Sequence, residues 1–299
     1  MTKYGQQTRE TLHSNKLAPK KRFGQNFLVH KMTAEAIVRA GKVSSTDTIV
    51  EVGVGLGALT LPLAATAQHV FGYEIDSGII RYHQDQGDLP DNVTLVHQDI
   101  LKTDFRELAQ QCGGNLKILA NLPYSISNPF IFKLIDNAPL ISSATIMLQK
   151  EVADRLMAAP NTKDYGVPTV LLASCASVRK LMTLKPGEFH PRPKIDSVVV
   201  TLDFSDGAKR PVAGQDYDFA LFRQLVRTTF NQRRKTILNT LSGANLWGDV
   251  VRADKSTNKE RICQAIEQAQ LQPSARPETL TCSDFINLAK EIARSTSSL

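Results

Sequence analysis

The chain has 299 residues and a net charge of +7, because 36 Lys and Arg side chains outnumber 29 Asp and Glu side chains. This balance favours a polyanion as partner, although a basic run more often marks a solvated face. No apolar run approaches the ~18 residues of a membrane span, and the polar N-terminus lacks the apolar core of a signal peptide. We therefore expect a soluble cytoplasmic protein that does not enter a membrane.

The four cysteines, Cys112, Cys175, Cys263 and Cys282, are scattered along the chain without CxxC spacing. Their positions indicate neither a metal site nor a disulfide framework, so we expect no metal.

Residues 1–22 are polar and basic without periodicity, which predicts a mobile leader. An amphipathic helix is expected over 33–40. Strands then alternate with helices, which is typical of a parallel sheet with helices on both faces. The predicted strands are 48–52, 69–73, 93–97, 116–120 and 144–148, and the intervening helices are 58–67, 77–85, 104–111 and 129–137.

Two further strands, 180–184 and 197–204, are predicted to close the sheet as an antiparallel pair joined by a Pro-rich loop. The polar stretch 205–218 reads as a linker. The remaining patterns are helical, at 219–230, 236–241, 259–268 and 283–293. We therefore expect three parts: the leader 1–22, an α/β domain over 23–205 and a helical domain over 206–299.

A glycine-rich segment, Glu51-Val52-Gly53-Val54-Gly55-Leu56-Gly57, joins the first strand of the sheet to its helix. Glycines there let the backbone turn tightly and let a ligand approach closely. Alone, this signal fits a dinucleotide, S-adenosylmethionine or packing only. The GxGxG spacing differs from the GxGxxG dinucleotide fingerprint, and no arginine stands ready for a pyrophosphate. Both features favour the methyl donor, with Gly53 and Gly55 in contact with it.

Two carboxylates follow the next two strands. Glu74 is placed to accept hydrogen bonds from ribose hydroxyls. Dinucleotide enzymes also have an acidic residue at this point, so Glu74 indicates a ribose but not which nucleoside carries it. Asp99 is placed to accept a hydrogen bond from an adenine amino group. The apolar side chains of Ile75 and Ile100 would then cover the two faces of the adenine ring. A lone Asp after a strand is more often a helix cap, but the carboxyl edge shared with Glu74 favours a ligand role.

The tetrapeptide Asn121-Leu122-Pro123-Tyr124 follows the strand 116–120. Pro123 restricts the backbone and leaves the Leu122 carbonyl without a ladder partner. The Asn121 side-chain oxygen and that carbonyl then form paired acceptors beside an aromatic ring, which suits a planar base with an exocyclic NH2 group. The alternative is an ordinary turn with a surface tyrosine.

Together these segments resemble the ribosomal RNA adenine dimethyltransferase family, and within it the small-subunit type. The resemblance covers nearly the whole chain from Arg22, and the ordered occurrence of its motifs is specific. One departure is Val54, where the family usually has Pro. Besides the segments above, the motifs are Arg22-Phe23-Gly24-Gln25-Asn26-Phe27-Leu28, Met147-Leu148-Gln149-Lys150-Glu151-Val152, Phe189-His190-Pro191-Arg192-Pro193-Lys194-Ile195-Asp196-Ser197, Phe230-Asn231-Gln232-Arg233-Arg234-Lys235-Thr236 and Arg276-Pro277-Glu278-Thr279-Leu280.

The resemblance implies a Rossmann-like S-adenosylmethionine-dependent methyltransferase fold, with a mostly parallel seven-stranded sheet and a small all-α C-terminal domain. It implies transfer of two methyl groups to each of two adjacent adenosines in a hairpin near the 3′ end of small-subunit (16S) ribosomal RNA, within a small-subunit assembly particle. Asn26 and Leu28 are expected to touch the cofactor. We expect a monomer.

Two further groups of residues receive roles from this resemblance. Tyr124 is predicted to be one aromatic wall for a base that leaves its stack, and Phe189 the other, unless Phe189 is a core residue of its loop. Arg233, Arg234 and Lys235 are predicted to contact RNA phosphates; a solvated helix end is the alternative.

Three rival functions share parts of this pattern. A large-subunit (23S) RNA adenine methyltransferase usually has Ile where this chain has Leu122, and a DNA adenine methyltransferase tends to have a second Pro before the aromatic. A non-catalytic ribosome-assembly or transcription factor on the same scaffold does not need the intact Glu74, Asp99 and Asn121.

Overall fold

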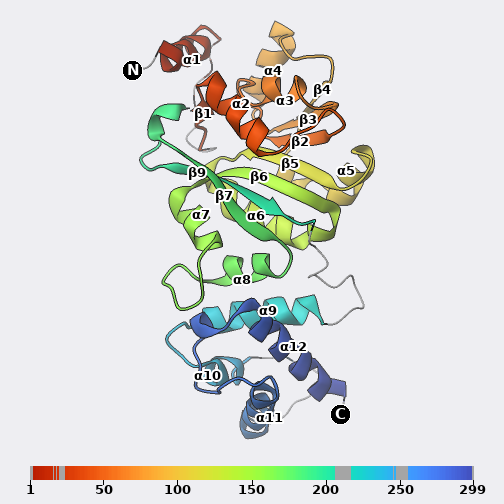
Figure 1. The fold of residues 1–299 in the computed structure, drawn as a ribbon, viewed down its shortest axis with the longest axis vertical. Coiled ribbons are helices and arrows are strands. Elements are labelled where there is room, and N and C mark those ends of the chain that lie inside the picture. The colour runs from red at the N-terminus through yellow and green to blue at the C-terminus, as the bar shows by residue number, and fades with distance from the viewer. Residues whose placement is uncertain are drawn as a thin grey trace. The chain divides into compact units, whose positions relative to one another are not determined.

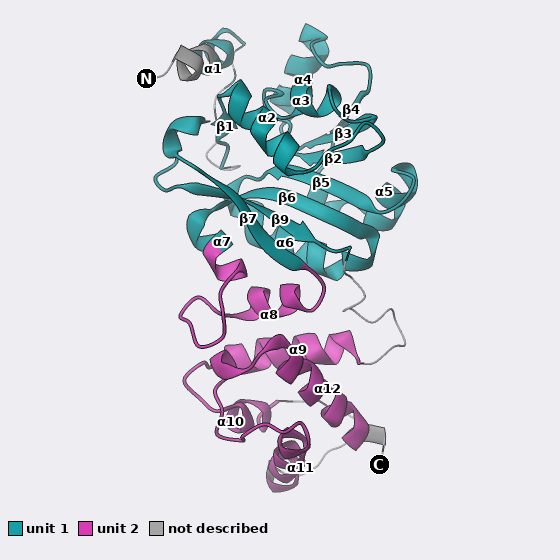
Figure 2. Cartoon of the chain, in the orientation of Figure 1, with its two compact units in different colours: residues 1–153, 177–206 teal, residues 154–176, 207–299 magenta. Residues whose placement is uncertain are grey.

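The computed structural model describes residues 3–15, 17, 19, 24–205, 217–244, 246 and 255–297. Its chain divides into two compact units (Figures 1 and 2). We call residues 1–153 and 177–206 the sheet unit, and residues 154–176 and 207–299 the helical unit.

The sheet unit contains a seven-stranded sheet (Figure 1). Its strands lie in the order β4 (Val93–His97), β3 (His69–Glu74), β2 (Thr48–Val52), β5 (Leu116–Asn121), β6 (Ile141–Gln149), β9 (Ser197–Asp203) and β7 (Ser177–Leu184). The strands from β4 to β6 are parallel, and β9 runs antiparallel to both β6 and β7. This confirms the predicted parallel sheet and its antiparallel closing pair.

Helices cover both faces of this sheet. They are α2 (Lys31–Ala40), α3 (Thr60–Ala64), α4 (Ser77–Gln86), α5 (Phe105–Gln111) and α6 (Ser127–Asp136), with the 3-10 turns η2 (Ile100–Lys102), η3 (Tyr124–Ile126), η4 (Ala138–Leu140) and η5 (Pro186–Glu188). Ile49 and Val70 pack with apolar residues of α2 and α3, whereas Val50, equally buried, faces the other side of the sheet because successive side chains alternate. Right-handed crossovers place α5 and α6 there, after the strand order reverses at β2.

The structure describes residues 3–15, 17 and 19 of the segment predicted to be a leader. Helix α1 (Lys3–Ser14) occupies most of residues 1–22. Leu12 on this helix is only 3% exposed and packs with Phe27 and Ile79. A short ribbon lies nearby, in which β1 (Phe27–Leu28) pairs antiparallel with β8 (Phe189–His190). The sequence of this helix has only two large apolar residues, Tyr4 and Leu12, which is too weak a periodicity to predict it.

The helical unit is built around the apolar faces of four helices: α9 (Phe219–Phe230), α10 (Ile237–Leu241), α11 (Lys255–Gln268) and α12 (Cys282–Ser297). The predicted C-terminal helices are thus present. The structure also assigns residues 154–176 to this unit, although they were expected in the α/β domain.

The reason is the packing of helix α8 (Val167–Ala173), which contacts α9 and α12 and buries Val170 and Leu171 completely. The Tyr165 hydroxyl adds a 2.8 Å hydrogen bond to the Leu280 carbonyl. Helix α7 (Lys150–Leu156) begins in the sheet unit and ends in the helical unit. The local sequence does not show that residues 154–176 belong to the helical unit, because the helices that α8 contacts lie more than 45 residues further along the chain.

Glu51 is a fully buried carboxyl group in β2, an inner strand of the sheet that pairs with β3 and β5. Neither of its oxygens has a hydrogen-bond partner among the described residues. Burial raises the pKa of Glu51 to about 8, and the charge of nearby Glu74 acts in the same direction. The carboxyl group is therefore mostly protonated at neutral pH, because an unpartnered charge in this position would be costly.

This ionisation makes stability depend on pH, and Glu51→Gln tests it. Folded protein keeps the Glu51 proton up to about pH 8, whereas the unfolded chain releases it near pH 4.5. The free energy of unfolding of the wild type should therefore fall between these values, by at most about 1.4 kcal/mol per pH unit from this group. Glu51→Gln does not titrate, so denaturant unfolding should show its advantage over wild type growing from pH 5 to pH 8. The exposed Glu107→Gln is the control, and stability curves for Glu51→Gln that parallel the wild type would contradict the prediction.

Candidate active site

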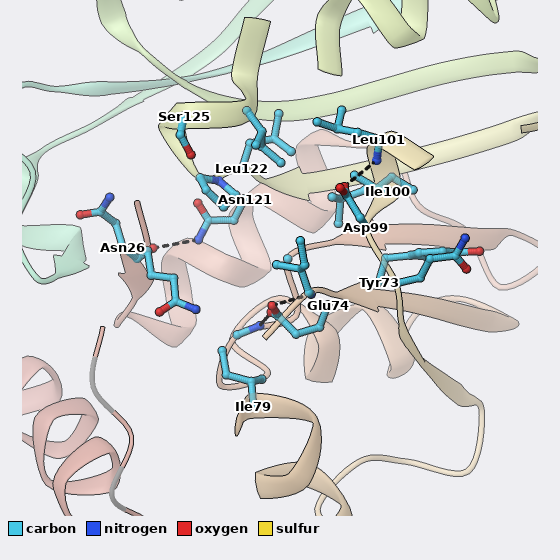
Figure 3. A pocket seen from close by; sticks show the side chains of 18 of the residues that line it. Asn26, Tyr73, Glu74, Ile79, Asp99, Ile100, Leu101, Asn121, Leu122 and Ser125 are labelled. Atoms are coloured by element: carbon cyan, nitrogen blue, oxygen red, sulfur yellow. Dashed lines mark hydrogen bonds between the residues drawn. The ribbon is translucent and has the colours of Figure 1, made fainter. Parts of the chain in front are cut away.

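The pocket of interest lies where four neighbouring parallel strands end, at the carboxyl edge of β4, β3, β2 and β5 (Figure 3). Crevices outside the carboxyl ends of strands, where strand order reverses, are the usual binding sites of open α/β sheets. All of its lining residues belong to the sheet unit. They are Gln25, Asn26, Phe27, Val52, Gly53, Gly55, Tyr73, Glu74, Ile75, Ile79, Gln98, Asp99, Ile100, Leu101, Asn121, Leu122, Pro123, Ser125 and Ile126.

The glycine turn, residues 53–57, forms the wall of this pocket that follows β2. Gly53 and Gly55 have φ angles of +85° and +56°, in the left-handed region that side chains disfavour. A Cβ on Gly53 would also lie 3.0 Å from the Asn121 carbonyl oxygen. Both predicted glycines line the pocket, so the turn brings bare backbone up to a ligand.

Glu74 ends strand β3 and is only 6% exposed. Its Oε2 accepts from the Gly55 amide at 3.1 Å, and its Oε1 accepts from the amides of Ile75 and Asp76, both at 2.8 Å. Burial raises the pKa of Glu74, while these three hydrogen bonds oppose the shift. A carboxylate offers about four acceptor positions, so Oε2 keeps capacity for a ligand hydroxyl.

Asp99 combines both of the roles weighed from sequence. Its Oδ1 accepts from the Leu101 amide at 2.9 Å and caps the turn η2, so this oxygen acts as the helix cap. The residue nevertheless lines the pocket, as do Ile100 and Ile75. Ile100 is buried, but Ile75 is 42% exposed, which is unusual for a large apolar side chain and leaves it available to cover a flat ring.

Asn121 is oriented by the opening motif. Its Nδ2 donates to the Asn26 carbonyl oxygen at 3.2 Å (Figure 3), and the Asn26 side chain in turn donates to the Gly24 carbonyl at 3.0 Å. This bond assigns the amide nitrogen to the Asn26 side and turns Oδ1 away from it. Within the described part of the chain, neither Asn121 Oδ1 nor the Leu122 carbonyl accepts a hydrogen bond. Two acceptors from adjacent residues therefore remain at the pocket.

Tyr124 lies directly after the paired acceptors, in the turn η3. The Tyr124 ring is half-buried and its hydroxyl contacts Ser197 Oγ at 2.8 Å; burial raises its pKa. Tyr124 borders the pocket through its neighbours Pro123 and Ser125, which line it.

Phe189 and Leu28 pair across the β1–β8 ribbon, are 3% and 4% exposed, and belong to the apolar core under α2 and α3. Leu28 also lines a smaller hollow beside the glycine turn, together with Gly53, Gly55 and Asn121. For Phe189 this position is the core alternative that the sequence offered.

Sequence reasoning missed several lining residues, including Gln25, Phe27, Tyr73 and Ser125. Gln25 and Phe27 flank Asn26 in the opening motif. Gln25 donates to Asp76 Oδ2 at 3.1 Å and so links that motif to the start of α4. Position next to a predicted ligand residue was the available signal, but it does not say which side chains turn inward.

The three basic residues predicted for RNA lie in the helical unit, in a turn between α9 and α10 and not inside a helix. Arg233 donates from its guanidinium to the carbonyl oxygens of Lys163 and Thr162, at 2.7 and 3.3 Å. It therefore fastens a loop of its own unit. Arg234 and Lys235 are exposed.

None of the helices among the described residues combines the length and apolar character of a membrane span. Nor do any three His, Cys, Asp or Glu side chains of those residues gather as a metal-binding group.

Comparison with known proteins identifies the family. The model of the ribosomal RNA adenine dimethylase family matches residues 16–276. The chain is 59% identical over 288 residues to the ribosomal RNA small subunit methyltransferase A of Desulfotalea psychrophila, covering 96% of each sequence. It is 37% identical to the protein of the same name from Syntrophus aciditrophicus, covering 96% of this chain and 99% of the relative.

Solved structures agree with this relationship. A dimethyladenosine transferase from Plasmodium falciparum superposes with a TM-score of 0.73 at 26% identity, over 90% of this chain and 98% of the other. The 23S rRNA methyltransferase ErmE shares the fold, with a TM-score of 0.60 at 22% identity over 90% of this chain and all of the other. The expected methyltransferase fold is thereby confirmed, and the chain belongs to the ribosomal RNA adenine dimethylase family.

Proposed function

We propose that the protein uses S-adenosylmethionine to dimethylate N6 of two adjacent adenosines in a hairpin near the 3′ end of small-subunit (16S) ribosomal RNA. The observation that carries this proposal is the pair of acceptors at the end of β5, with Asn121 oriented by Asn26. Family membership and the small-subunit names of the relatives support the substrate.

The pocket fits the methyl donor by the chemistry of its lining. Glu74 would hold the ribose hydroxyls, Asp99 the adenine amino group, and Ile75 and Ile100 the two faces of the adenine ring. The glycine turn and Asn26 would lie along the amino-acid portion. When bound, the cofactor supplies an electrophilic methyl group on a sulfonium sulfur.

The protein's own contribution to the reaction is orientation. The N6 lone pair of adenine is delocalised into the ring, so the amine is a poor nucleophile. Asn121 Oδ1 and the Leu122 carbonyl would each accept one of its hydrogens and favour a pyramidal nitrogen whose lone pair points at the methyl group. No strong base is required. After one transfer a single hydrogen remains, which one acceptor can hold, so a second methyl can be added to the same nitrogen.

The base has to leave its stack to reach these acceptors, and Tyr124 is the aromatic wall proposed to receive it. The helical unit is proposed to bind structured RNA through its exposed basic residues, with Arg234 and Lys235 on phosphates. We place the activity in the cytoplasm, on a small-subunit assembly particle, with the protein acting as a monomer.

The direct test is incubation of the protein with labelled S-adenosylmethionine and small subunits lacking these methyl groups, followed by mapping of the label. Dimethyladenosine at two adjacent positions near the 3′ end is the expected result. Label found only in large-subunit RNA, or only in DNA, would refute the proposed substrate.

Glu74→Ala should weaken binding of S-adenosylmethionine about 10- to 100-fold. The change removes hydrogen bonds to a charged acceptor, each worth ~1.5–3 kcal/mol. Calorimetric titration measures the affinity, and thermal unfolding checks that the variant folds, since Glu74 also holds three backbone amides. The exposed Glu107→Ala should bind like wild type. Unchanged affinity in Glu74→Ala would remove this carboxylate from the ribose site.

Asn121→Ala should slow methyl transfer far more than it weakens cofactor binding. Loss of one preorganised hydrogen-bonding group typically costs on the order of 10²-fold in rate. Single-turnover rates at saturating cofactor and RNA isolate this step. Asn121→Asp keeps an acceptor but loses the N–H donated to Asn26, so it separates acceptance from orientation. Near wild-type transfer by the alanine variant would rule out a role for the side chain.

Reversal of charge at both Arg234 and Lys235 should weaken binding to the small-subunit particle and flatten its salt dependence. The slope should fall by up to about 0.9 log units per lost phosphate contact, an upper figure taken from duplex DNA. Arg39→Glu with Arg106→Glu, in exposed positions of the sheet unit, changes the net charge equally and serves as control. An unchanged affinity and slope would mean that these charges only face solvent.

A further inference from the structure

We propose that His83 is a positioning residue for the cofactor pocket, which holds the glycine turn in the conformation that binds the ligand. The inference rests on the proposed function in one respect, since it takes S-adenosylmethionine as the ligand of that turn. His83 does not line the pocket, and no motif of the sequence pointed to it.

Both backbone polar groups of Gly55, its amide and its carbonyl, contact side chains. Its amide donates to Glu74 Oε2 at 3.1 Å, on the ligand side of the turn. Its carbonyl oxygen lies 2.8 Å from His83 Nε2, on the side that faces helix α4. The peptide units on either side of a residue with φ of +56° are thereby pinned by two different side chains.

His83 is itself fixed. Its side chain is 1% exposed, and its Nδ1 lies 2.7 Å from Asp88 Oδ1, just beyond the end of α4. The ring also lies close to Gly57, since a Cβ added to that glycine would lie 3.6 Å from His83 Cε1. A chain of contacts thus runs from Asp88 through His83 and Gly55 to Glu74, the residue proposed for the ribose.

Both partners of the ring are acceptors. The Asp88 carboxylate lies at Nδ1 and the Gly55 carbonyl oxygen at Nε2, so the ring acts on the glycine turn as a hydrogen-bond donor. The contact with Asp88 fixes the orientation in which Nε2 faces the Gly55 oxygen.

The test compares the affinity of His83→Leu and His83→Gln for S-adenosylmethionine. The leucine variant loses the N–H donated to Gly55 and should bind S-adenosylmethionine roughly tenfold or more weakly in calorimetric titration. Its rate at saturating cofactor should stay close to wild type, because the ring touches no reacting group. His83→Gln can still donate an N–H and should recover part of the affinity. Wild-type affinity in a folded leucine variant would overturn the proposal.

A wild type that binds no S-adenosylmethionine would instead overturn the proposed function, and with it the ligand named here.

Discussion

The site depends on one constraint, the sharp turn at residues 53–57 that follows strand β2. Its left-handed glycines allow the Gly53 amide to reach the Tyr73 carbonyl at 2.9 Å and the Gly55 amide to reach Glu74. Glycine at position 53 also avoids a close contact at the end of β5, because an added Cβ would lie 3.0 Å from the Asn121 carbonyl oxygen. Both the carboxylate and the paired acceptors keep their positions because this turn stays narrow.

The acceptors in turn depend on a segment almost a hundred residues earlier in the chain. Asn26 lies outside the sheet, yet its carbonyl selects which end of the Asn121 amide faces the pocket. In a reaction that proceeds by orientation, an amide turned the wrong way would present two N–H donors to an amine that needs acceptors. The opening motif therefore acts on the reacting end of the site.

Much of this arrangement could be predicted from the sequence, because it follows from period and order. Apolar runs bounded by turns located β2 to β5 closely, and parallel strands bring their carboxyl ends to one edge. That rule alone gathers Glu74, Asp99 and Asn121.

What could not be predicted depends on contacts that are distant in sequence. Phe189 and Leu28 had motif positions suited to a ligand, but they meet each other in a two-residue ribbon and are used as core. Residues 154–176 pack with the C-terminal helices, and Arg233 holds a loop from that stretch. Each is a question of which partner a segment finds, and local pattern carries no such information.

The central claim is that the end of β5 presents two acceptors to an adenine amine beside the proposed ribose site. A crystal structure of the protein with S-adenosylhomocysteine and adenosine tests it most directly. We predict that the ribose hydroxyls of the cofactor product are hydrogen-bonded to Glu74. The adenosine N6 should lie within hydrogen-bonding distance of both Asn121 Oδ1 and the Leu122 carbonyl oxygen. An amine bound elsewhere, or an Asn121 oxygen turned to a protein donor, would contradict it.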